Sequence, residues 1–412
     1  MKIKPHHIAV SIPVISIMFD IIIMHFASEG TMLPQLIRAA TMFGIIGYLI
    51  YPKIKVNSVT ASIILFLLYV LIIIVVRIPE PAELVLGIEW ISKIAIGMLL
   101  VFVGYRHVNC EHRISRLNQN TFLAGVILVI YFLVVNIFEI GTSMYFQDET
   151  MFDEMSIIRT GMMGGVGMNT ISYILLLAPL IYYSRKNAGR MSPLVYHIVF
   201  VSLLIILFLV LRRSAILIVI AGYAIYMINH QVLISSVKKS MIAVFIISLA
   251  VLPVFQPYIY SIYELRGDRV ISTQAFEHDT RTGELRYMID KTLQSNDISY
   301  ILFGESFNTL GVYANAAVYR SLHSDISNLL YITGVIGLLL YLMIHLVIIN
   351  YAFRFRKYAP GIYFTVLIVL VVASILLMYP GRLTGITYKS IMYIYVGSII
   401  GLMYRNYINS KV

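Results

Sequence analysis

Residues 198–228 read IVFVSLLIILFLVLRRSAILIVIAGYAIYMI, two apolar runs that only Arg212, Arg213 and Ser214 separate. Similar runs recur along the whole chain, which is 59% hydrophobic and 12% charged and has a mean hydropathy of +0.86. No soluble domain of 412 residues tolerates this composition. The sequence therefore predicts a protein that lies in a lipid bilayer.

A helix needs about twenty apolar residues to cross the hydrocarbon core of a membrane. We predict an all-α protein with about twelve such helices, at 8–26, 32–51, 58–77, 84–104, 121–141, 166–184, 192–211, 214–229, 240–262, 326–350, 361–379 and 384–404. A count of ten or eleven spans would require that one of the less apolar segments, such as 32–51, does not cross the membrane in this way. Because no soluble domain or internal repeat is evident, residues 1–412 are predicted to form one membrane domain.

Lysine and arginine are distributed unevenly among the predicted loops. Alternate loops and the two ends hold 17 of the 31 Lys and Arg residues, together with one acidic residue, Glu111. Cytoplasmic loops carry this kind of excess, so we predict that both termini are cytoplasmic. The net charge of +11 then reflects orientation beside an anionic inner leaflet and gives no reason to expect a nucleic-acid partner.

One long polar segment, Glu264 to Asp325, follows the ninth predicted span, so this topology places it outside the cytoplasm. Its 62 residues contain nine Asp or Glu, six Lys or Arg and two His. Within it, residues 279–293 predict a short amphipathic helix, since four apolar residues recur at helical spacing: Leu285, Met288, Ile289 and Leu293. Asp279 or Thr280 would cap this helix, which would lie on the bilayer surface or cover a cavity.

An ionisable residue inside a membrane span costs free energy, so each such residue requires a structural or functional explanation. They include Asp20, Arg38, Glu89, Lys93 and Glu139. Glu89 and Lys93 stand four residues apart, so they share a helical face and can neutralise each other. We interpret this set mainly as structural ion pairs or as side chains that reach the interface, with substrate contact as the alternative.

Other polar groups lie at the predicted outer face. Arg212 and Arg213 interrupt two apolar runs there, against the positive-inside bias, so they contact either lipid phosphate or a bound phosphate ligand; we favour the ligand. His323 ends the outer segment and is either a hydrogen-bonded cap or a catalytic group. The chain has no HExxH, P-loop or GxSxG motif and a single cysteine, Cys110, which gives no support to a metal site, an ATPase, a serine hydrolase or a disulfide.

These features, in this order, resemble the superfamily of O-antigen polymerases (Wzy-type) and O-antigen ligases, which are bacterial polytopic membrane glycosyltransferases. The resemblance covers about residues 160–345. The matching blocks are the Gly- and Asn-led span at 164–180, the junction Arg212-Arg213-Ser214, the RxxxL element from Arg281 to Leu285, and the H(x)10G element from His323 to Gly334.

The resemblance implies an all-helical GT-C-type fold with short helices in the large outer loop (264–325) between spans 9 and 10. It also implies transfer of a glycan from undecaprenyl diphosphate without a metal or other cofactor, with inversion at the anomeric carbon. His323 would be the general base, and four arginines would bind the diphosphate: Arg212, Arg213, Arg281 and Arg286. The secondary site candidates are Arg320, Asp325 and Arg382.

A polymerase and a ligase share this donor and differ in the acceptor, which is another lipid-linked repeat unit or the lipid A core. We expect a polymerase of O-antigen, capsule or exopolysaccharide in the bacterial inner membrane, with its active site at the outer face. Its expected partners are undecaprenyl-diphosphate-linked oligosaccharide and membrane lipid, with a chain-length regulator protein as a further candidate. The alternatives are an O-antigen ligase and a transporter or flippase of lipid-linked saccharide, whose charge would be spread over many spans.

Overall fold

The structure, a computed structural model, describes residues 4–26, 33–51, 56–76, 81–138, 140, 164–188, 192–209, 213–228, 280–313, 321–381 and 385–411. Of these residues, 88% are helical and none lies in a strand, which confirms the all-α prediction. The predicted span at 240–262, Glu139, Arg212, Arg320 and Arg382 lie outside the described residues, as does the side chain of Arg213.

Most described helices begin and end within about five residues of the predicted spans, but the helix that corresponds to the span predicted at 121–141 begins at Glu111. They are α1 (Pro5–Phe26), α2 (Leu33–Ile50), α3 (Ser58–Val76), α4 (Pro81–His107), α5 (Glu111–Ile137), α6 (Gly164–Ala188), α7 (Pro193–Leu209), α8 (Arg213–Ile228), α12 (Thr280–Gln294), α13 (Ile298–Phe303), α14 (Asp325–Phe355), the 3-10 turn η3 (Arg356–Tyr358), α15 (Gly361–Met378) and α16 (Ile386–Asn409). Seven of them are long and apolar enough to cross a membrane, namely α1, α3, α4, α5, α14, α15 and α16. Apolar stretches of α2, α6, α7 and α8 are shorter, so the count of twelve spans stays a prediction.

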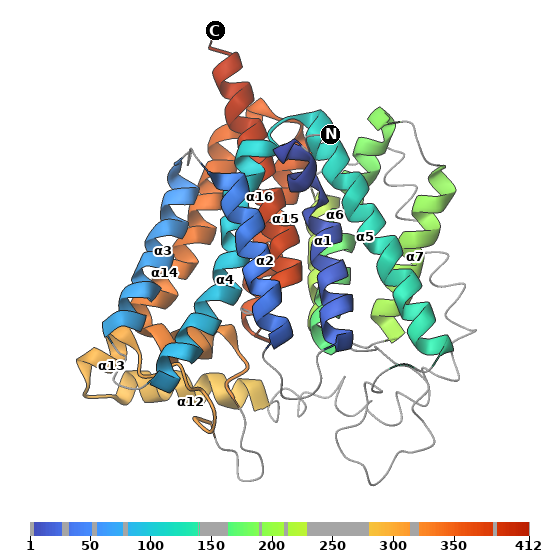
Figure 1. Cartoon of the computed structure of the whole chain (residues 1–412). Coiled ribbons are helices and arrows are strands. Elements are labelled where there is room, and N and C mark those ends of the chain that lie inside the picture. Colours follow the sequence, from blue (N-terminus) through green and yellow to red (C-terminus); the bar gives the residue numbers. More distant parts are fainter. Residues whose placement is uncertain are drawn as a thin grey trace.

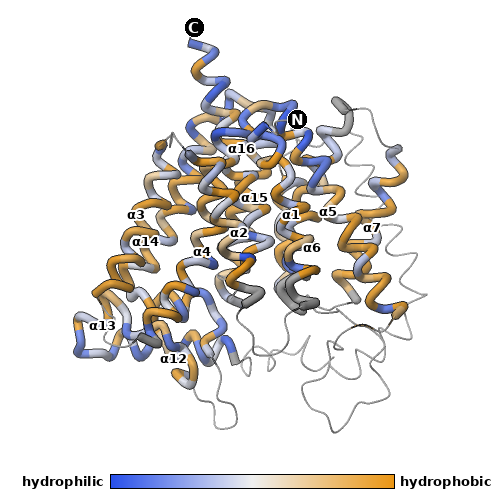
Figure 2. The backbone as a smooth tube through the Cα atoms, in the orientation of Figure 1, coloured by the Kyte–Doolittle hydropathy of each residue, from blue (hydrophilic) through white to orange (hydrophobic). Residues whose placement is uncertain are grey.

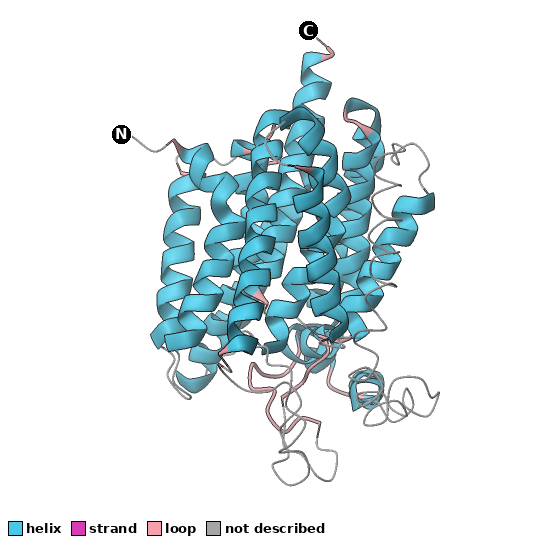
Figure 3. Cartoon of the chain, turned by 90° about the vertical axis from the view of Figure 1, so that its right-hand side faces the viewer, coloured by secondary structure: helices cyan, strands magenta, loops and turns pink. Residues whose placement is uncertain are grey.

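The long helices run side by side as one bundle (Figures 1 and 3). In Figure 1, α1 begins and α16 ends at one end of the bundle, whereas α12 and α13 lie across the opposite end. Hydrophobic residues dominate the middle of the bundle, and hydrophilic residues gather toward its ends (Figure 2). This arrangement agrees with the predicted placement of the polar outer segment at the end away from both termini.

Helices α4 and α16 form the central contact of the bundle, and glycine makes their close approach possible. A Cβ at Gly104 would lie 2.3 Å from the carbonyl oxygen of Ile394, and a Cβ at Gly397 would lie 2.1 Å from that of Val101. Any side chain would meet backbone at these positions, so only glycine allows this spacing, as in other membrane helix pairs. As a result, 94% of the apolar, membrane-length part of α16 is buried inside the protein.

Helix α14 is interrupted near its start, at Gly334, whose φ of 66° is left-handed. The end of α13 fills this break, since a Cβ at Gly334 would lie 2.4 Å from the backbone of Leu302. Across the same junction, the N–H of Glu305 donates to the carbonyl of Tyr331 at 2.6 Å. Glycine is therefore needed at position 334 of the H(x)10G element for two reasons. It adopts the left-handed backbone conformation, and it leaves room for α13.

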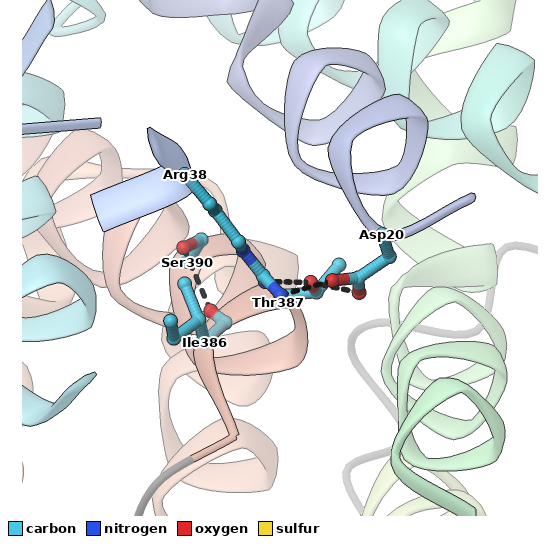
Figure 4. A network of polar contacts seen from close by, with 5 residues as sticks. All are labelled: Asp20, Arg38, Ile386, Thr387 and Ser390. Carbon is cyan, nitrogen blue, oxygen red and sulfur yellow. Dashed lines mark hydrogen bonds and ion pairs between the residues drawn. The ribbon is translucent and has the colours of Figure 1, made fainter. Parts of the chain in front are cut away.

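A buried ion pair joins three helices (Figure 4). Arg38 of α2 pairs with Asp20 of α1 and donates to the hydroxyl of Thr387 of α16 at 2.8 Å. The Thr387 hydroxyl in turn donates to the Asp20 carboxylate. Asp20 is only 6% exposed, so each charge is neutralised where water is scarce, and the structure gives this pair a role in packing.

We expect Gly397→Ala to destabilise the protein, because its new methyl group would force α4 and α16 apart. Overpacking of this kind costs about 1–3 kcal/mol, which should lower the thermal unfolding midpoint of the detergent-purified protein by several degrees. Gly44→Ala in α2 is the matched control, since nothing lies within 4 Å of a Cβ there. Equal midpoints for the two variants would contradict the proposed role of glycine in this contact.

Candidate functional site

A cavity of about 530 Å³ opens at the end of the bundle that carries α12 and α13. Its wall brings together segments far apart in the sequence: α4, the start of α12, the residues before and within the first turn of α14, and the α15–α16 connection. Three residues nominated from the sequence line it, namely Arg281, His323 and Asp325. The size is that of a small-molecule binding site.

The backbone at His323 is clamped by a buried carboxylate. The N–H of His323 donates to both oxygens of Glu284, at 2.9 and 3.0 Å, and the N–H of Ser324 donates to Glu284 Oε1 at 2.8 Å. Glu284 comes from α12 and is completely buried. A buried carboxylate that accepts from backbone N–H groups forms strong, charge-assisted bonds, so Glu284 ties α12 to the start of α14.

A glycine also packs directly against the backbone of His323. Gly381, just after α15, has a φ of +72°, and a Cβ there would lie 1.2 Å from the carbonyl oxygen of His323. The hydroxyl of Ser324 donates to the carbonyl of Met378 at 3.3 Å. His323 is thus positioned from two directions, by α12 and by the end of α15, while its own side chain remains exposed.

The imidazole of His323 is oriented by its own loop. Its Nδ1 lies 2.8 Å from the carbonyl oxygen of Ser321. A carbonyl only accepts hydrogen bonds, so Nδ1 carries the hydrogen and the neutral ring has its lone pair on Nε2. That tautomer is the one that a general base requires.

Helix α12 is held in place along its whole length. At its start, the hydroxyls of Thr282 and Tyr379 are 2.5 Å apart, and near its end Lys291 forms an ion pair of 2.7 Å with Glu305. Burial lowers the pKa of Lys291, but the hydrogen bond and charge of Glu305 outweigh this effect, so its pKa lies above the ordinary value. Lys291 therefore stays charged and joins α12 to Glu305 in the segment after α13.

The short helix predicted at 279–293 is present as α12. Its buried residues are Glu284, Met288 and Thr292, whereas Ile289 and Leu293 are exposed. Glu284 occupies a buried position because it makes the backbone bonds described above. Arg281 lines the cavity from the first turn, but Arg286 is exposed and lies outside the cavity lining.

Two buried charged residues had not been nominated as site residues. Glu284 gave no signal, because a glutamate beside an apolar stripe is usually solvated. Lys389 did carry one, since it is a charge within the apolar span of α16. It is 3% exposed, and its Nζ donates to the Tyr341 hydroxyl at 3.1 Å. It lies where α16 meets Gly97 of α4, just below the cavity.

No protein-family model and no curated protein sequence matches the chain. The chemistry must therefore be argued from the residues of the cavity. Within the described parts of the chain, no group of three His, Cys, Asp or Glu side chains converges as a metal site would need. What the cavity does hold is an oriented imidazole, a guanidinium, two carboxylates and an ammonium group.

We expect Glu284→Ala to release the backbone at His323, because two N–H groups lose the carboxylate that accepts from them. An unsatisfied buried donor costs about 1–3 kcal/mol, so amide hydrogen exchange at residues 322–326 should become roughly 5- to 150-fold faster. Asp290→Ala, at an exposed position of the same helix, is the control. If both variants protect these amides equally, Glu284 does not hold the loop.

Proposed function

We propose that this protein is a membrane glycosyltransferase that joins undecaprenyl-diphosphate-linked repeat units into a surface polysaccharide at the outer face of the bacterial inner membrane. The observation that carries the proposal is the meeting of His323 and Arg281 in one cavity at the end of a helical membrane bundle. The family resemblance of the RxxxL and H(x)10G elements supports it, because these two elements supply those two residues.

The reaction requires a hydroxyl of the acceptor sugar to lose its proton as its oxygen attacks the anomeric carbon of the donor. His323 Nε2 takes this proton, for which its tautomer is suited. The bond between the anomeric carbon and the diphosphate oxygen breaks, and its electron pair leaves with undecaprenyl diphosphate. A single displacement of this kind inverts the anomeric centre.

Negative charge grows on the diphosphate as that bond breaks. Arg281 places a permanent cation in the cavity, at the first turn of α12, where the helix dipole also favours an anion. A fixed cation stabilises the leaving group more in the transition state than in the ground state, which accelerates the step. Arg212, Arg213, Arg320 and Arg382 remain further candidates for the same task.

A ligase would use the same chemistry with a different acceptor. A transporter is the alternative of another class, and the interruption of α14 at Gly334 is a feature that transporters use to bind substrates. Here the end of α13 occupies the break, so its backbone groups face protein and leave no room for a ligand. We therefore favour transfer over transport.

We expect His323→Ala to stop chain extension, because general-base catalysis contributes about 10²- to 10⁴-fold to such a step. The measurement is gel analysis of surface glycan in cells whose only copy carries the variant, with the membrane level of the protein checked in parallel. A polymerase predicts a single repeat unit on the acceptor. His112→Ala, an exposed histidine in the first turn of α5, is the control.

The same gels separate the alternatives. Accumulation of lipid-linked polymer with no glycan on the acceptor indicates a ligase, and absence of any intermediate at the outer face indicates a flippase. Normal long polymer in the His323→Ala strain would contradict the role of His323 as base.

Arg281→Lys should also be severely impaired, since an ammonium group cannot form the forked bonds that a guanidinium makes to a diphosphate. The geometry distinguishes this residue from Arg286, which is exposed and outside the cavity lining. We expect Arg286→Lys to extend glycan at nearly the wild-type rate in membranes supplied with lipid-linked repeat units. Equal rates for both variants would remove Arg281 from the mechanism.

A further inference from the structure

Helix α4 presents a stripe of side chains to the cavity. Leu86, Glu89, Trp90 and Lys93 all line it, at the spacing of one helical face. This stripe, the α4 wall, contributes to the same cavity as Arg281 and His323. It belongs to the outer half of a helix whose inner half is packed against α16 through Gly97 and Gly104.

Elsewhere in the structure, ion pairs join different helices or segments, but the ion pair of the α4 wall joins two residues of the same helix. Asp20 and Arg38 join three helices, and Lys291 and Glu305 join α12 to the segment after α13. Glu89 and Lys93 instead pair within one helix, and among the described residues neither forms another ion pair or hydrogen bond.

The same two side chains also remain accessible. They are 35% and 30% exposed, although charges in an apolar span are costly. A pair that joins no elements and faces a cavity is best explained by a polar ligand that the cavity receives.

Trp90 adds an aromatic surface beside this pair. It is the one tryptophan of the chain, it is 9% exposed, and its ring meets Phe307 edge-on with centroids 6.1 Å apart. A rigid aromatic ring flanked by a carboxylate and an ammonium group suits a saccharide. Its hydroxyls donate to the carboxylate and accept from the ammonium group, while its C–H face contacts the ring.

We propose that the α4 wall binds the saccharide of the substrate, in the same cavity in which Arg281 receives the diphosphate. This inference rests on the proposed function and adds Glu89, Trp90 and Lys93 to the site as saccharide-binding residues. The saccharide belongs either to the acceptor or to the donor, both of which carry the same repeat unit. The cavity would then bind phosphate charge at Arg281 and saccharide hydroxyl groups at the α4 wall.

Because Trp90 is the only tryptophan, fluorescence excited selectively in tryptophan, and not in the 30 tyrosines, reports on this wall. The probes are the free repeat-unit oligosaccharide, released from extracted lipid-linked intermediates by mild acid, and undecaprenyl diphosphate without sugar. We expect the oligosaccharide to change the Trp90 emission saturably. Glu89→Gln and Lys93→Met should each weaken its binding about tenfold. The Kd of undecaprenyl diphosphate, measured separately by isothermal titration calorimetry, should change by no more than about twofold.

The charge exchange Glu89→Lys with Lys93→Glu separates ligand binding from helix stability. It keeps an ion pair on α4, so a purely structural pair predicts unchanged oligosaccharide binding, and that result would overturn the proposal. Loss of oligosaccharide binding at an unchanged thermal midpoint supports it.

The two sources of saccharide give different kinetics in the same variant. A raised KM for the acceptor with an unchanged KM for the donor assigns the wall to the acceptor, and the reverse assigns it to the donor. Fluorescence titration does not require turnover, so failure of this inference is distinct from the result with His323→Ala. Glu111→Gln, at an exposed position in the first turn of α5, is the control.

Discussion

The close contact between α4 and α16 is the constraint on which the rest of the structure depends. Two helices in a membrane gain little from hydrophobic burial against each other, so they must approach closely enough for van der Waals contact over a long surface. Glycines at 97, 104, 397 and 401 permit this approach. The contact ends near Gly97, and the cavity begins one turn further out, at Lys93 and Gly385. The cavity therefore lies at the end of the same helix pair that packs the core.

Helices α12 and α13 are attached to this bundle by hydrogen bonds to backbone groups as well as by buried apolar side chains such as Met288 and Tyr300. Glu284 accepts from the N–H groups of His323 and Ser324, and α13 fits into the break at Gly334. Such bonds fix the position of the backbone that they join. The roles proposed for His323 and Arg281 require accurate placement, because misplacement of a reacting group by about 1 Å can cost about a hundredfold in rate.

Charge is used in two ways in this chain. Asp20 and Arg38 neutralise each other where three helices meet, which suits a buried pair with a hydroxyl to complete its hydrogen bonds. Glu89, Lys93 and His323 at the cavity have more exposed side chains than this pair, so they can act on a ligand. The imidazole, the guanidinium and the α4 wall line the same cavity. In the proposed reaction this cavity would hold a lipid diphosphate and a sugar together.

The sequence by itself determined the membrane class, the bounds of most helices, the pairing of Glu89 with Lys93 and the common location of Arg281 and His323 at one end. These follow from hydropathy, charge bias and helical spacing, which depend on the solvent and the neighbours within one helix. Only the tertiary structure decided that α4 lines the site, that Glu284 is buried and that Arg286 faces away. Helical periodicity defines a face of a helix but not what covers that face. The contact between Glu284 and His323, which are 39 positions apart, arises from tertiary packing and not from the local sequence.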